Sequence, residues 1–108
     1  MKGFGGGGMA QLMKQANQMQ MRMKKAQEEL AQKTFEGTSG GGAVKATVTG
    51  ETLLKAIQIN PDVVKSGDVE MLQDLIITAT NEAIKVAKET SAKEMEKITG
   101  GMNIPGLF

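Results

Sequence analysis

Residues 9–33 contain no glycine or proline, and their apolar residues recur with the spacing of one face of a helix. These apolar positions are separated alternately by three and four residues. They are Met9, Leu12, Ala16, Met19, Met23, Ala26 and Leu30, named here the heptad seam. This spacing over three repeats predicts a helix of about 35 Å with a coiled-coil-like face.

The hydrophobic period changes to two within residues 34–59. The alternating apolar residues are Val44, Ala46 and Val48, which is typical of a half-buried strand. Further strands are predicted at residues 34–39 and 54–59, joined by the glycines at 40–42 and by a turn at Gly50-Glu51. Three short strands with tight turns predict an antiparallel meander.

Helix-start residues introduce the last part of the chain. Asn60 as a cap and Pro61 at the first helical position predict a short helical turn over residues 61–65. Asp68 is a second cap and predicts a long helix over residues 69–99, which ends before two glycines. The predicted fold is α+β: a long N-terminal helix, a three-stranded antiparallel meander, a short helical turn and a long C-terminal helix.

The last helix carries two apolar stripes. The broader stripe consists of Leu72, Leu75, Ile76, Ala79, Ala83, Val86 and Ala87. Beyond it the same face turns polar, at Thr90, Lys93, Glu94 and Lys97. A helix of this pattern outruns its core, so its C-terminal part is expected to project into solvent or to line a cleft.

The narrower stripe predicts an interface with a second copy of the chain. It consists of Ile77, Ile84 and Met95. At about 100° per residue, these three lie well over a quarter of a turn around the helix from the broader stripe. Two long helices and a small meander cannot cover both stripes, and a two-fold self-complementary patch is the commonest way to bury the excess. We therefore expect a homodimer; a two-helix hairpin folded on its own strands is the alternative.

Composition limits the chemistry. In 108 residues we expect one domain over residues 9–99, between flexible tails at 1–8 and 100–108. The chain has no cysteine and no histidine, which removes disulfides, thiolate or imidazole catalysis and Cys/His zinc sites. The glycines at 3, 5 and 8 match a dinucleotide fingerprint without the strand that it requires, so no cofactor is expected.

Neither an enzyme nor a membrane protein is predicted. No convincing nucleophile–base pair or metal cluster can be assembled from these residue types, and no small-molecule substrate is expected. No apolar run reaches 18 residues and no export segment is present, so the expected location is the cytoplasm. A role at the membrane surface is not favoured either, because the first helix lacks an aromatic anchor.

Charge is distributed unevenly although the net charge is only +1. Residues 1–33 carry six cations and two acids, a balance of +4, and the remaining 75 residues carry seven cations and ten acids, a balance of −3. Opposite the heptad seam lie Lys14, Gln18, Arg22 and Lys25, whose cations extend along roughly 16 Å and suit successive phosphates. An ordinary solvated helix face is the alternative interpretation.

Five segments, in this order, are shared with one known family: MAQLMKQANQMQMRMKKAQEELAQ, FEGTSGGGAVKATVTG, INPDVV, DVEMLQDLIITATNEAIKVAKE and KITGGMNIPGLF. None is diagnostic by itself, but their ordered combination covers nearly the whole chain. The sequence resembles the YbaB/EbfC nucleoid-associated proteins of bacteria from end to end.

This resemblance implies an α–β–β–β–α subunit in a tweezer-shaped homodimer whose helices project as two arms. It also implies binding of double-stranded DNA with little or modest sequence preference, location in the nucleoid, an influence on gene expression, and no enzymatic activity. By position in the matching helices, the expected phosphate contacts are Lys14, Arg22, Lys24, Lys25, Lys33, Lys93 and Lys97.

A prefoldin-like protein-interaction or chaperone module is the alternative function. Paired long helices flanking hairpins, together with nine methionines, suit a surface that holds other proteins. DNA binding predicts retention on duplex DNA that weakens steeply as salt rises, whereas a chaperone would suppress aggregation without retaining DNA.

Overall fold

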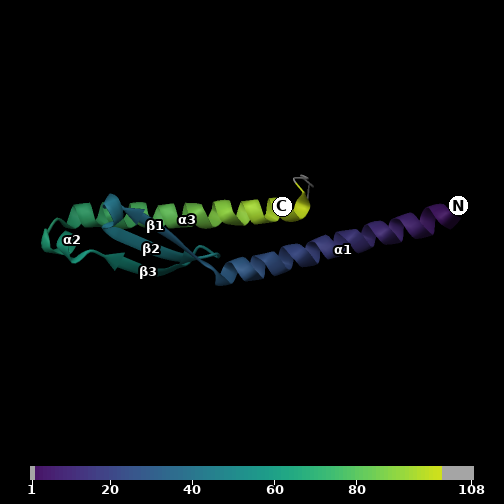
Figure 1. Ribbon diagram of the computed structural model, residues 1–108, viewed down its shortest axis with the longest axis horizontal. Helices are drawn as coiled ribbons and strands as arrows, with labels where there is room; N and C mark the ends of the chain where they lie inside the picture. Colours follow the sequence, from purple (N-terminus) through teal and green to yellow (C-terminus); the bar gives the residue numbers. More distant parts are fainter. Residues whose placement is uncertain (1, 101–108) are drawn as a thin grey trace.

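The computed structural model of the protein describes residues 2–100, with side chains from residue 8 onward, as an elongated molecule of 78 × 21 × 17 Å (Figure 1). Its elements are α1 (Lys2–Gln32), β1 (Thr34–Ser39), the 3-10 turn η1 (Gly40–Gly42), β2 (Val44–Thr49), β3 (Leu54–Ile59), α2 (Pro61–Lys65) and α3 (Val69–Thr99). The predicted α+β class and the predicted order of elements are confirmed.

The start of the first helix differs from the prediction. α1 begins at Lys2 and includes the glycine-rich residues that were expected to form a tail at 1–8. Each glycine weakens a helix by about 1 kcal/mol relative to alanine, but the backbone hydrogen bonds need no side chain and no proline interrupts them. The helix boundary is therefore corrected from residue 9 to Lys2, while flexibility of this segment stays a prediction. Beyond Gly100, the expected C-terminal tail lies outside the described residues.

The three strands form the expected meander. Their order is β1-β2-β3 and both pairings are antiparallel, with Phe35 opposite Val48 and Ala46 opposite Ile57. All three glycines of η1 have positive φ angles of 59°, 68° and 96°, a conformation that glycine adopts without steric cost. The Gly40–Gly42 connection therefore depends on its glycines.

Both predicted helix starts are present. The Asn60 side chain accepts a hydrogen bond from the Asp62 backbone N–H (2.9 Å), and Asp68 accepts one from the Met71 N–H (3.0 Å). Each cap satisfies a backbone donor that has no partner within its helix. At the other end, Gly100 adopts φ 66° and closes α3 in a left-handed cap.

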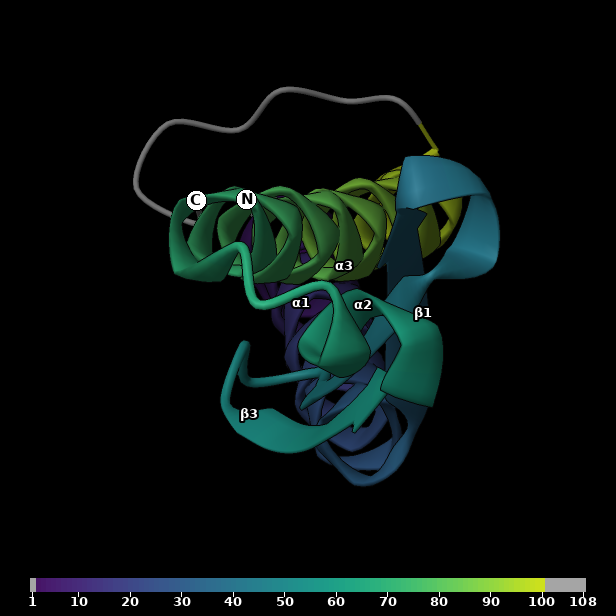
Figure 2. The ribbon, with the colours of Figure 1, turned by 90° about the vertical axis from the view of Figure 1, so that its left-hand side faces the viewer.

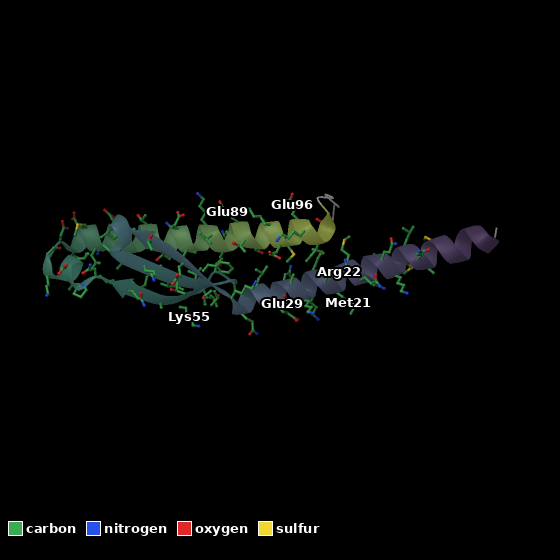
Figure 3. The ribbon with its side chains drawn as sticks, viewed as in Figure 1. Met21, Arg22, Glu29, Lys55, Glu89 and Glu96 are labelled. Carbon is green, nitrogen blue, oxygen red and sulfur yellow. The ribbon has the colours of Figure 1, made fainter. Side chains whose placement is uncertain are left out.

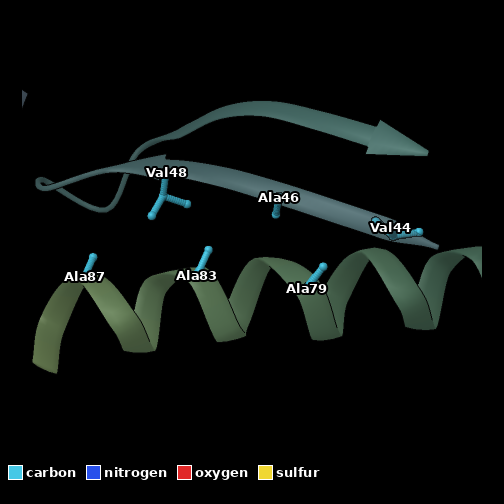
Figure 4. Close-up of a cluster of buried hydrophobic side chains, with 6 residues drawn as sticks. All are labelled: Val44, Ala46, Val48, Ala79, Ala83 and Ala87. Atoms are coloured by element: carbon cyan, nitrogen blue, oxygen red, sulfur yellow. The ribbon is translucent and has the colours of Figure 1, made fainter. Parts of the chain in front are cut away.

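The core lies between α3 and one face of the sheet (Figure 4). It is built from small side chains, all at most 1% exposed: Val44, Ala46, Val48, Ala79, Ala83 and Ala87. The helix approaches the sheet so closely that a Cβ on Gly37 would overlap the backbone of Ala79 and Ala83. Backbone-to-backbone proximity therefore sets the position of α3.

The C-terminal half of α1 packs against the rest of the described chain, whereas residues 8–18 are all exposed. α1 runs antiparallel to α3, and its first half continues beyond the end of α3 (Figure 1). Within the heptad seam, Met23 and Leu30 are only 8% and 4% exposed. Gly50 donates a backbone hydrogen bond to the Lys33 carbonyl (3.1 Å), and a Cβ on Gly50 would overlap the Leu30 carbonyl. The C-terminal end of α1 therefore packs directly against the β2–β3 turn.

This arrangement changes the expectation for the second half of α3. Thr90 and Glu94, on the face that was predicted to project into solvent or to line a cleft, are half-buried, and α1 lies along this half of α3. Packing of the heptad seam against α3 covers part of both helices. The helix that projects beyond the body is α1.

Candidate nucleic-acid interface

The side of α1 that faces away from α3 forms a positive surface without acids, which begins in the projecting half of the helix and continues past the buried Met23. We define the α1 arm as residues 8–25, in which every residue from 8 to 18 is exposed. The arm carries four cations, Lys14, Arg22, Lys24 and Lys25, and no carboxylate. The first acids of the helix are Glu28 and Glu29, below the arm. Negative charge on α1 is thus confined to the end that is attached to the body.

Five predicted phosphate contacts lie on α1 or at its end. Lys14, Arg22, Lys24 and Lys25 are exposed, and so is Lys33 in the connection to β1 (Figure 3 shows Arg22). At 100° per residue, Lys14 and Lys25 lie nearly opposite Met23, on the side of the helix away from α3. The structure therefore leaves these two lysines free to meet a large anionic partner.

The two predicted contacts on α3 have a different environment. Lys93 and Lys97 are exposed, but the Lys97 Nζ lies 3.4 Å from Glu94 Oε1. Glu89 and Glu96 occupy the side of α3 that points away from α1 (Figure 3). Cations and acids therefore alternate on this helix, and its positive charge is locally balanced.

The predicted dimer-interface residues lie along one side of α3. Leu75 packs against Gly40, and its carbonyl accepts a hydrogen bond from Ser39 Oγ (2.6 Å), which places the Leu75 side of α3 over the β1 end of the sheet. Ile77 and Ile84 are about 180–200° around the helix from Leu75, hence toward β3. Ile77 is 57% exposed, whereas Ile84 packs partly against the core and Met95 is half-buried.

β3 contributes apolar residues that the sequence analysis did not include in this interface. Ile57 and Ile59 pair with Ala46 and Val44, so they face the same side of the sheet as the core. α3 lies mainly over β1 and β2, whereas β3 forms the edge of the sheet away from β1 (Figure 2). Ile57 and Ile59 are consequently only half-buried, and Leu54 is 51% exposed. We name Leu54, Ile57, Ile59, Ile77 and Ile84 the β3–α3 face.

Two further findings concern metal sites and membranes. Within residues 2–100, no group of three or more acidic, histidine or cysteine residues could hold a metal ion. None of the helices in this part of the chain has the length and apolar character needed to span a bilayer.

Comparison with known proteins gives consistent results. The YbaB/EbfC DNA-binding family matches residues 5–102. A nucleoid-associated protein of Caldanaerobacter subterraneus subsp. tengcongensis is 58% identical over 107 residues, which cover 98% of this chain and 96% of that protein. A nucleoid-associated protein of Clostridium acetobutylicum is 54% identical over 105 residues, covering 97% of this chain and 94% of the relative.

A solved structure shares the fold. The crystal structure of an uncharacterized protein from Helicobacter pylori superposes with a TM-score of 0.70 at 23% identity, covering 84% of this chain and 96% of the other. The predicted family resemblance is thus confirmed along nearly the whole sequence. From the extent of the family match and the identity to these relatives, this chain is a member of the YbaB/EbfC DNA-binding family.

Proposed function

We propose that the protein binds double-stranded DNA as a homodimer, through phosphate contacts of the α1 arm, with little or modest sequence preference. The observation that carries the proposal is the cationic side of the α1 arm, where all four cations are exposed and no acid is present. Neutralising phosphates with such cations releases counterions, which supplies the sequence-independent part of DNA affinity. Membership of a DNA-binding family supports the same partner.

The geometry of the arm suits a duplex. Lys14 and Lys25 are 11 residues apart, which is about 16 Å along a helix and about five base pairs along DNA. Because the whole chain has a net charge of only +1, the attraction is concentrated in the arm. We therefore expect moderate affinity with strong salt dependence.

The β3–α3 face is the proposed dimer interface. It joins the predicted Ile77 and Ile84 with an uncovered edge strand, and a second copy would bury Leu54, Ile57 and Ile59 as well. A two-fold interface of this kind presents two α1 arms to one duplex. Two linked arms bind more tightly than one because the second contact becomes intramolecular. A role of Met95 at the interface stays a prediction.

Charge reversal tests the DNA-binding surface. The variant Lys14→Glu/Arg22→Glu/Lys25→Glu should bind a labelled duplex at least about tenfold more weakly, and its slope of log affinity against log salt should fall by about 0.9 per lost contact. The matched control reverses three exposed lysines of the body, Lys55, Lys65 and Lys85. Fluorescence anisotropy at several salt concentrations measures both. Undiminished binding by the arm variant at low salt would refute the assignment.

A single substitution tests the dimer. Ile77→Arg places a charge on the α3 part of the β3–α3 face and should halve the mass measured by light scattering while the helical circular dichroism is retained. Met21→Arg is the control, since Met21 is 70% exposed on the α1 arm. A parent protein that is monomeric in dilute solution would remove the basis of the two-armed clamp.

We also propose association with the nucleoid in the cytoplasm and an influence on gene expression, in line with the names of the relatives. Imaging of a fluorescent fusion tests the location: its signal should follow the chromosome and spread when the triple charge reversal is introduced.

The exposed Met9, Leu12 and Met13 favour a protein-holding module as the second candidate. Suppression of client aggregation together with no duplex binding would support that candidate instead.

A further inference from the structure

Amide side chains are concentrated on α1. The described part of α1 carries seven of them, at Gln11, Gln15, Asn17, Gln18, Gln20, Gln27 and Gln32, whereas α3, also 31 residues long, carries only Gln73 and Asn81. Glutamine can stabilise a helix by pairing with a carboxylate one turn away. No acid precedes Glu28 in the chain, so that explanation does not apply to the α1 arm.

Three of these amides form a row with a cation. Gln11, Gln15 and Gln18 are spaced by four and three residues, and Arg22 follows after another four. Residues with this spacing share one face of a helix, and all four are exposed. We name Gln11, Gln15 and Gln18 the amide row. It lies about a third of a turn from the buried Met23, with Lys14 and Lys25 beside it on the side away from α3.

The position of the amide row suits insertion into DNA. A helix with its side chains is about 10–12 Å across, and the major groove is about 12 Å wide. The row extends about 10 Å, which corresponds to about three base pairs. Because this part of α1 continues beyond the end of α3, the body does not stand beside it (Figure 1). The arm is thus able to enter a groove.

Carboxamides favour one base in that groove. A glutamine side chain accepts a hydrogen bond from adenine N6 and donates one to adenine N7, a pairing that the other bases do not offer. Lysine and arginine beside the row reach phosphates without reading sequence. We propose, on the basis of the DNA binding proposed above, that the amide row contacts adenine edges in the major groove and gives the protein a modest preference for adenine-containing sites.

The test separates base contacts from phosphate contacts. In one duplex the adenines are replaced by 7-deazaadenine, which removes the N7 acceptor and leaves the phosphates, the minor groove and Watson–Crick pairing unchanged. The parent protein should bind the unmodified duplex about three to ten times more tightly than the modified one. Gln11→Ala/Gln15→Ala/Gln18→Ala should bind both duplexes equally, with the salt slope of the parent.

A matched variant controls for the loss of amides in general. Asn17→Ala/Gln20→Ala/Gln27→Ala removes three exposed amides of the same helix that lie off the row, and it should keep the preference of the parent. Alanine is the strongest helix former, so neither variant weakens α1. Equal binding of both duplexes by the parent, or loss of preference only in the control variant, overturns the amide row and leaves DNA binding intact. Failure of the parent to bind any duplex at low salt overturns both proposals.

Discussion

α1 and α3 are both 31 residues long, yet their surroundings and charges are opposite. α3 has three alanines buried against the sheet, while α1 buries Met23 and Leu30 and leaves residues 8–18 exposed. α1 carries five cations and two acids, and α3 carries four cations and six acids. One helix holds the body together and the other extends from it.

The difference follows from side-chain size and backbone approach. Alanine and glycine let α3 approach the sheet until the backbones touch, and such a close-packed contact tolerates little change. The heptad seam of α1 consists largely of methionine and alanine, and methionine is flexible and adapts to irregular contacts. A long helix with so few buried residues is stabilised mainly by its own backbone hydrogen bonds. It is therefore available for a partner.

The largest effect is expected where α3 meets the sheet. Gly37→Val forces side-chain atoms into the backbone of Ala79 and Ala83 and should lower the free energy of unfolding by about 4 kcal/mol or more. Thr38→Val, on the exposed opposite face of β1, is the control and should change it by less than about 0.5 kcal/mol. Urea unfolding at fixed protein concentration measures both; equal effects would contradict the close approach.

The second largest effect on the free energy of unfolding shows how far along α1 the heptad seam is packed against the body. Leu30→Ala removes a buried side chain of the heptad seam and should cost about 3 kcal/mol. Leu12→Ala changes the same residue type in the same seam, but Leu12 is 62% exposed, so it should cost less than about 0.5 kcal/mol. A large loss in Leu12→Ala, measured by urea unfolding, would mean that another surface covers the arm.

A smaller effect is expected at the β2–β3 turn. Gly50→Ala places a Cβ on the Leu30 carbonyl and should cost about 2 kcal/mol, with faster amide hydrogen exchange in residues 26–33. Gly8→Ala has no neighbour within 4 Å and should instead raise stability by about 0.5–1 kcal/mol. If Gly50→Ala left amide hydrogen exchange in residues 26–33 unchanged, contact with the turn would not hold the end of α1 in place.

The smallest effect concerns the charges of α3. Lys93→Gln/Lys97→Gln should reduce duplex affinity by less than about twofold, since Glu94 and its acidic neighbours already balance these lysines. Lys14→Gln/Lys25→Gln on the α1 arm, with the same loss of charge, should have a several-fold larger effect. Anisotropy titrations at one salt concentration compare them. A larger loss in the α3 variant would assign DNA contacts to that helix.

Most of the fold was predictable because strong local signals mark the element boundaries. Asn60 and Asp68 cap their helices, and the glycines at 40–42 supply the positive φ angles of their turn. The alternation of Val44, Ala46 and Val48 identified the buried face of the sheet. The start of α1 was misplaced because glycine propensity predicts a tail, whereas an uninterrupted backbone extends the helix to Lys2.

The candidate site was predictable in part. Helical spacing placed Lys14, Arg22 and Lys25 on the exposed surface of one helix. It did not show that Ile57 and Ile59 on β3 are left partly uncovered, because strand order and the position of α3 over the sheet decide this. The amide row was also missed, since exposed glutamines become distinctive only once α1 is known to project alone.

Local patterns thus determined where the helices, strands and turns lie, which faces are apolar, and that positive charge gathers near the N-terminus. Only the tertiary structure decided which long helix is buried and which one extends. The heptad seam and the broader stripe of α3 are both amphipathic, and either pattern by itself is compatible with a packed helix. How far each of these two apolar faces is buried depends on the strand order, on the close backbone approach at Gly37 and on the contact between Gly50 and the end of α1. All three involve residues that are distant in the chain.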